Sequence, residues 1–81
     1  MITVLFFAQV REQVGCERMA LASEFTTVEA LRQSLAARGG NWALALEQDR
    51  LLSAVNQVLV EGGHPLSAGD EVAFFPPVTG G

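Results

Sequence analysis

The stretch that decides the fold is Glu71-Val72-Ala73-Phe74-Phe75-Pro76-Pro77-Val78-Thr79-Gly80-Gly81. Its first five residues alternate as a half-buried strand does, with Val72 and Phe74 on one face. Pro76 and Pro77 cannot donate to a sheet, so we expect the strand to end at Phe75 and the chain to leave the domain extended. The sequence therefore predicts a folded domain over residues 1–75 and a flexible C-terminal tail over residues 76–81.

The tail ends in two glycines, which offer only backbone and a terminal carboxylate. Six extended residues span on the order of 20 Å, and glycine fits a channel too narrow for a Cβ atom. A carboxylate must be activated before acyl transfer, yet the chain has no phosphate-binding glycine loop, no nucleophile with its base and acid, and no metal cluster. We expect Gly81 to be the reactive group, no metal site and no bound cofactor in this chain, and another protein to be the catalyst.

The amino-acid composition indicates which class of protein this is and which kinds of partner it can bind. The 81 residues form one small domain, and 49% hydrophobic against 17% charged residues indicates a packed core. A net charge of -4 lacks the basic footprint of a nucleic-acid-binding protein and suits a partner with a positive surface. A single cysteine, Cys16, excludes an internal disulfide and favours a reducing cytoplasm. The apolar opening is too short to span a membrane.

The N-terminal part predicts two strands of a hairpin. Residues 2–7 form the first strand, in which Thr3, Leu5 and Phe7 share one face. Residues 9–15 are expected to be a loop or turn, and residues 17–22 return as the second strand.

The middle of the chain predicts helices. Thr26 and Glu29 fit a capping box that starts a helix, which carries an apolar stripe of Val28, Leu31 and Leu35. We expect the glycine pair at residues 39–40 to end this helix in the left-handed conformation. Residues 41–46 predict a short helix over one end of the core, anchored by Trp42.

Residues 51–56 and 57–61 read as strands, and turn-forming residues lead from there to the last strand. This order of elements is the plan of a ubiquitin-like β-grasp domain, of class α+β. Its mixed sheet has one main helix crossing one face and a short second helix. The right-handed crossover rule allows the first and last strands to lie parallel as neighbours.

Two aromatic residues are candidates for a partner surface. If Glu71 and Thr3 mark the solvent face of their strands, Phe75 and Phe7 lie on that face near the root of the tail. The alternative is that either ring covers the edge of the core, since a shift by one residue inverts the faces. Phe6 and Phe74 are expected in the core.

Several segments of the chain resemble the small, sulfur-carrying subunit of molybdopterin synthase. The resemblance is strongest over residues 69–81 and extends to residues 4–12, 27–32, 42–47 and 54–57. It implies that an enzyme of the ubiquitin-activating type uses ATP to adenylate Gly81, and that a sulfur-donating protein then converts it to a thiocarboxylate. The large catalytic subunit would receive the tail and pass sulfur to a cyclic pterin precursor, within a heterotetramer. The chain would be a non-catalytic subunit.

The resemblance also assigns roles to individual residues. Gly81 would carry the sulfur. The threading residues would be Val78, Thr79 and Gly80, and the docking residues Phe7, Arg11, Phe75, Pro76 and Pro77.

Other functions remain open. The chain could carry sulfur for thiamine or another thio-metabolite, or it could be a ubiquitin-like protein modifier or interaction module. Cys16 has no basic neighbour or helix start that clearly activates it, and His64 has no second ligand nearby, so both are expected to be incidental. The absence of lysine could protect an activated terminus from self-linkage, but a genomic preference for arginine is the favoured explanation.

Overall fold

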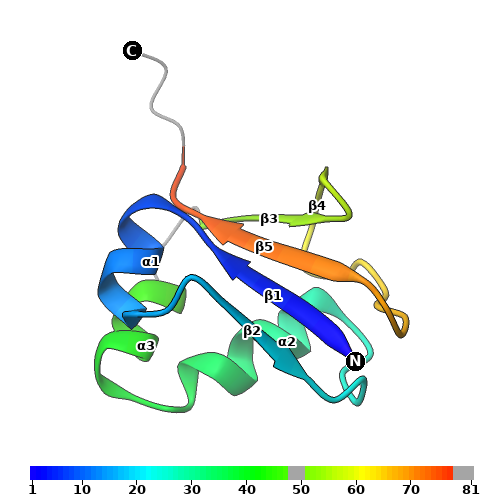
Figure 1. Cartoon of the computed structure of the whole chain (residues 1–81), viewed down its shortest axis with the longest axis horizontal. Helices are drawn as coiled ribbons and strands as arrows, with labels where there is room; N and C mark the ends of the chain where they lie inside the picture. The colour runs from blue at the N-terminus through cyan, green and yellow to red at the C-terminus, as the bar shows by residue number, and fades with distance from the viewer. Residues whose placement is uncertain (48–50, 78–81) are drawn as a thin grey trace.

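A five-stranded mixed sheet forms the frame of the domain (Figure 1). The computed structural model describes residues 1–47 and 51–77. The strands are β1 (Ile2–Phe6), β2 (Arg18–Leu21), β3 (Leu52–Val55), β4 (Val58–Val60) and β5 (Glu71–Phe75). The helices are α1 (Ala8–Val14), α2 (Val28–Ala36) and α3 (Gly40–Leu46).

The last strand, β5, occupies the middle of the sheet, whose order is β2-β1-β5-β3-β4. It pairs parallel to β1, with Phe6 opposite Phe74, and antiparallel to β3, with Leu52 opposite Phe75. The predicted parallel pairing of the first and last strands is confirmed, as is the β1–β2 hairpin.

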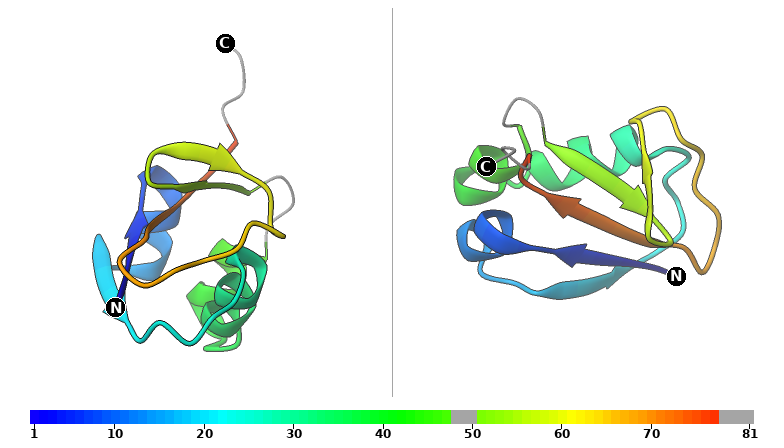
Figure 2. Two further views of the ribbon diagram at one scale, coloured as in Figure 1. Left: turned by 90° about the vertical axis from the view of Figure 1, so that its right-hand side faces the viewer. Right: turned by 90° about the horizontal axis from the view of Figure 1, so that it is seen from above.

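The core lies between the sheet and the helices α2 and α3, which lie on the same side of it (Figure 2). Val4, Phe6, Val72 and Phe74 point inward from the two central strands and are fully or almost fully buried. Each such side chain contributes roughly 1.5–3 kcal/mol by leaving water. The apolar stripe of α2 is buried as predicted, at Val28, Leu31 and Leu35.

Three aromatic rings pack together at the end of the core that α3 covers. The rings of Phe6 and Phe74 stack with centroids 6.4 Å apart, and Trp42 meets Phe6 edge to face at 5.6 Å. Both predictions are confirmed: Phe6 and Phe74 are core residues, and Trp42 anchors the short helix.

The loop predicted over residues 9–15 is wrong, because these residues form most of α1. Val10 is fully buried and Val14, four residues later, packs against the core, so the helix buries one narrow stripe. Gly15 ends it with φ 71° and donates its N–H to the Arg11 carbonyl at 2.9 Å. Besides Ala8, only Val10 and Val14 are apolar in this seven-residue helix, too few for a periodic pattern.

The predicted cap of α2 is one residue out. Thr27, not Thr26, accepts a hydrogen bond from the Ala30 N–H, at 3.1 Å. The Glu29 N–H, the expected partner of Thr26, is instead taken by the Gly62 carbonyl at 2.8 Å. A carbonyl from a distant loop therefore decides the cap, which a local sequence pattern does not reveal.

The glycine pair does not end α2 as predicted. The helix ends at Ala36, and its C-cap Ala37 remains right-handed. Gly39 and Gly40 do have positive φ, 76° and 55°, but Gly39 is the N-cap of α3 and Gly40 its first residue. The glycines therefore make the corner between the two helices.

Candidate functional site

The root of the tail lies at the end of the central strand. Phe75, the last residue of β5, lies opposite Leu52, the first residue of β3. Pro76 and Pro77 follow, both partly buried, and they lack the N–H groups that would continue the ladder. The chain therefore leaves the sheet between β1 and β3, at the end where α1 begins (Figure 1).

The expected positions Val78, Thr79, Gly80 and Gly81 lie outside the described residues. The described part of the candidate site ends at Pro77.

One face of the sheet carries no helix among the described residues, and an apolar surface runs across it. Residues that are cross-strand partners share a face, and the registers connect Leu5 to Ala73, Ala73 to Ala54, and Ala54 to Leu59. Leu52 and Phe75 are a further pair on this side. We call this surface the open face; it consists of Leu5, Leu52, Ala54, Leu59, Ala73 and Phe75.

The open face is apolar and reaches solvent most at one edge. Leu59 on the edge strand β4 is 63% exposed, whereas Phe75 is only partly exposed in the middle of the sheet. The predicted alternation of β5 is confirmed, since Val72 and Phe74 are buried and Glu71, Ala73 and Phe75 are not. A contiguous apolar surface of this kind on a small domain is typical of a partner interface.

Phe7 borders the open face. It follows Phe6 at the end of β1, serves as the N-cap of α1 with extended backbone, and is 46% exposed. Its N–H donates to the Phe74 carbonyl at 3.2 Å, which continues the parallel ladder by one residue. The strand register therefore brings Phe7 beside Phe75, as the sequence predicts.

Arg11 lies one turn along α1 from Phe7 and is exposed. Its N–H donates to the Phe7 carbonyl at 3.3 Å, so the position of Arg11 is tied to that aromatic residue. Leu52 and Leu59 were missed by sequence reasoning, whereas Leu5 was predicted on the face of Thr3 and Phe7 but not as part of the partner surface. Val58, Leu59 and Val60 are three apolar residues in a row, so alternation alone does not reveal which one faces out, and the register was needed.

A polar bracket fixes where β5 begins. The Asp70 carboxylate accepts the Ser67 N–H at 2.8 Å and the Asn56 side-chain amide at 3.1 Å. Asn56 in turn accepts the Glu71 N–H at 3.1 Å through its side chain. The Ser67 N–H, and then the Asn56 amide, lower the pKa of Asp70 because they stabilise its ionised form. The bracket holds β5 in register with the β3–β4 hairpin.

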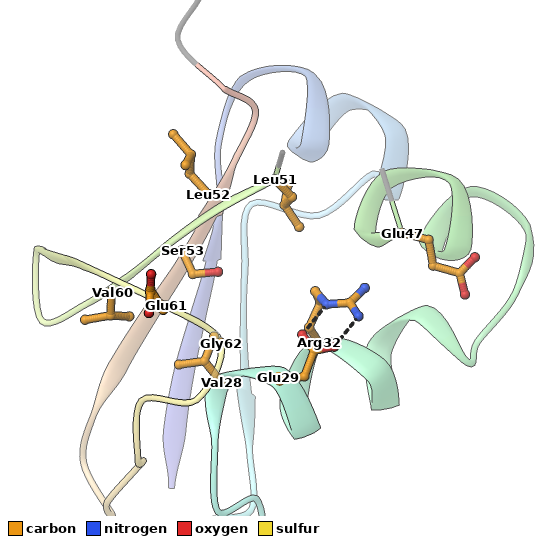
Figure 3. Close-up of a pocket in the computed structure, with 10 residues that line it drawn as sticks. All are labelled: Val28, Glu29, Arg32, Glu47, Leu51, Leu52, Ser53, Val60, Glu61 and Gly62. Carbon is orange, nitrogen blue, oxygen red and sulfur yellow. Dashed lines mark hydrogen bonds and ion pairs between the residues drawn. The ribbon is translucent and has the colours of Figure 1, made fainter. Parts of the chain in front are cut away.

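A depression of about 520 Å³ lies between α2 and the β3–β4 hairpin (Figure 3). Within it Glu29 and Arg32 form an ion pair at 2.6 Å, and Arg32 also donates to the Leu46 carbonyl. The guanidinium lowers the pKa of Glu29, and the same hydrogen bond raises the pKa of Arg32. The two charges thus neutralise each other.

The described residues offer little chemistry of their own. Across residues 1–47 and 51–77, no three His, Cys, Asp or Glu side chains are grouped as metal ligands. Cys16 donates its thiol hydrogen to the Arg18 carbonyl at 3.1 Å. In the same parts of the chain, no helix is long and apolar enough to cross a membrane.

Comparison with known proteins gives consistent matches over the whole chain. The model of the ThiS family matches residues 4–81. The chain is 67% identical to a molybdopterin synthase sulfur carrier subunit of Escherichia coli, and 53% identical to one of Haemophilus influenzae. Both alignments cover 81 residues and 100% of each chain.

A solved structure extends the comparison to an assembly. The complex of subunits 1 and 2 of molybdopterin-converting factor from Helicobacter pylori contains a chain that aligns with a TM-score of 0.71 and 26% identity. The alignment covers 99% of this chain and 97% of that one. The β-grasp fold predicted from the sequence is therefore confirmed.

Proposed function

The chain belongs to the ThiS family and shares the sulfur-carrier role of its molybdopterin synthase relatives, and on that premise we propose how its surface and tail perform this role. The chain acts with a partner subunit as the sulfur donor, not as a catalyst on its own. The open face and Phe7 dock on the partner, and the tail from Pro76 onward enters the partner's active site.

The single observation that carries this proposal is the position of the tail root. Phe75 belongs both to the open face and to the strand that feeds the tail, and Leu52 lies directly opposite it. A partner that covers the open face therefore also receives the chain that leaves it. Pro76 and Pro77 restrict the backbone at this point, so docking sets the direction of the tail.

The proposed chemistry takes place at the Gly81 carboxylate. A carboxylate oxygen is a poor leaving group, so an adenylating enzyme consumes ATP to form the acyl adenylate and releases pyrophosphate. A sulfide-level sulfur nucleophile, supplied by a donor protein, then attacks the acyl carbon, displaces AMP and leaves a thiocarboxylate. In the synthase the thiocarboxylate gives its sulfur to a cyclic pterin precursor, and water restores the carboxylate. This chain binds no cofactor, and the reducing cytoplasm suits its thiocarboxylate.

Intact-mass spectrometry tests the central step. The full chain is incubated with the adenylating enzyme, ATP and the sulfur donor of a molybdopterin synthase system, and one oxygen should be replaced by sulfur at Gly81. A variant that lacks Gly81 is the control and should keep its mass. An unchanged mass of the full chain, under conditions that charge the Escherichia coli relative, contradicts the proposal.

A genetic experiment separates this role from other carriers. Expression of the chain in a strain without its own small subunit should restore molybdoenzyme activity. Restoration of thiamine synthesis alone, in a strain without its thiamine sulfur carrier, would instead assign the chain to that pathway. Amide-linked conjugates that need Gly81 would indicate a protein modifier.

A further inference from the structure

A second depression, of about 370 Å³, adjoins the open face where β1, β2 and α1 meet. Its apolar lining comes from β1 and the residue after it. Its charged lining comes from α1, from β2 and from the residue just before β2. The lining residues are Leu5, Phe6, Phe7, Arg11, Glu17 and Arg18.

Arg18 belongs to the same side of the sheet as the open face. It is the cross-strand partner of Leu5, and it is exposed on the edge strand β2. Arg11 reaches the depression from the other side, one helical turn beyond Phe7. Two arginines therefore line a depression whose apolar lining includes Leu5 of the open face.

Neither arginine has a charged partner within the described parts of the chain. Arg32 is ion-paired with Glu29, and Arg38 lies 4.7 Å from the centre of the Trp42 ring. No ion pair involves Arg11 or Arg18 in residues 1–47 and 51–77. In a chain with net charge -4, this depression is lined by two arginines and one glutamate, Glu17, and so has a local excess of positive charge.

We propose that this depression receives a carboxylate side chain of the large partner subunit, bound between Arg11 and Arg18. The proposal rests on the proposed function, because it takes the open face as the surface that this subunit covers. Interfaces commonly combine an apolar centre with a charged rim, and arginine is the cation best suited to bind a carboxylate. The two arginines would set the orientation of this domain on the large subunit, because they lie near β2, at the edge of the sheet opposite Leu59.

The test measures affinity of the full chain for the large subunit by titration calorimetry at two salt concentrations. Rim charges act mainly on association rate and salt dependence. We expect Arg18→Gln to weaken binding about 5-fold and the Arg11→Gln/Arg18→Gln pair about 20-fold, with a smaller salt dependence than wild type. Arg38→Gln is the matched control, because Arg38 is exposed but does not line this depression. The affinity of the Arg38→Gln variant for the large subunit should equal that of wild type.

Substitution of Glu17 should affect the affinity for the large subunit in the opposite direction to substitution of the arginines. Its side chain lines the same depression, so Glu17→Gln should leave the affinity unchanged or raise it. Weaker binding by Glu17→Gln together with unchanged binding by Arg18→Gln would show that the depression takes a cation, and would overturn the proposal. Thermal unfolding of each variant checks that the fold is kept.

The outcomes distinguish the two levels of the proposal. If the wild-type chain binds the large subunit and Arg18→Gln binds equally well at both salt concentrations, the carboxylate site is wrong and the proposed function stands. If the wild-type chain does not bind the large subunit at all, both are wrong.

Discussion

Phe7 donates its backbone N–H to the carbonyl of Phe74 at 3.2 Å. This hydrogen bond joins a half-exposed aromatic residue at the start of α1 to the fully buried residue that precedes Phe75. The surface that we propose for docking is thereby attached directly to the strand that carries the tail. A change in one side chain at this point can separate binding from folding, because only one of the two rings lies in the core.

Replacing Phe7 with serine should weaken binding of the large subunit and spare the fold. Phe7 is the N-cap of α1 and makes no side-chain cap hydrogen bond, whereas serine is a preferred N-cap residue. The gain at the cap offsets part of the lost packing, so we expect the free energy of unfolding to stay within about 1 kcal/mol of wild type. Affinity should fall by about 10-fold or more, as measured by calorimetry.

Phe74→Ala provides the contrast. Phe74 is fully buried against Phe6, so its truncation should cost about 3–5 kcal/mol in urea unfolding. Unchanged affinity of Phe7→Ser would show that the partner does not cover Phe7.

Leu59→Ser and Val58→Ser form a matched pair on β4. Both residues are 63% exposed, but Leu59 lies opposite Ala54 on the open face, whereas Val58 lies opposite the buried Val55. We expect both variants to unfold within about 1 kcal/mol of wild type. Leu59→Ser alone should weaken the complex, because only Leu59 belongs to the open face that the partner is proposed to cover. Equal affinities of the two variants would exclude β4 from the docking surface.

Thr27→Ala should destabilise the domain by about 1 kcal/mol, because the Ala30 N–H loses its acceptor at the start of α2. In a domain of this size that corresponds to a decrease in Tm of roughly 4–8 °C. Thr26→Ala is the control: Thr26 is exposed and accepts the Leu66 N–H through its backbone carbonyl, which the substitution keeps. A larger loss in Thr26→Ala than in Thr27→Ala would contradict the observed cap.

The bracket at Asp70 should make stability depend on pH. The pKa of Asp70 is lowered in the folded state, so its stabilising effect is fully present above the ordinary aspartate pKa of about 3.9. The effect is lost as the pH falls through the lower pKa of the folded state. The Tm of wild type should therefore exceed that of Asp70→Ala at pH 7, and the difference should narrow below about pH 4.

Asp70→Asn serves as the control for this measurement. Its side chain keeps an acceptor oxygen but does not ionise, so the difference between Asp70→Asn and Asp70→Ala should not narrow at low pH. A wild-type advantage that stays constant down to pH 2.5 would mean that ionisation of Asp70 does not stabilise the fold.

Sequence alone predicts the centre of the sheet well because β1 and β5 bury every second residue. Alternation in residues 71–75 and 2–7 gives the right faces, and the crossover rule gives the parallel pairing of β1 and β5. The stripe of α2 is equally clear. The site is predicted where it depends on these same faces, as for Phe7 and Phe75.

The remaining features depend on contacts between distant segments. The cap of α2 is set by the Gly62 carbonyl, far along the chain, and α1 is stabilised by burial of Val10. Leu59 and Arg18 join the open face only through strand register, and their own neighbours in sequence do not reveal it. Tertiary pairing, not local propensity, determines these positions.

The central place of β5 also has a consequence for synthesis of the protein. Because β5 lies between β1 and β3, the sheet cannot form until the ribosome has released the chain through Phe75. Its pairing with β1 spans almost the whole sequence, so a truncated product lacks the middle of its sheet. A partner that covers the open face would therefore bind only chains that extend at least through Phe75.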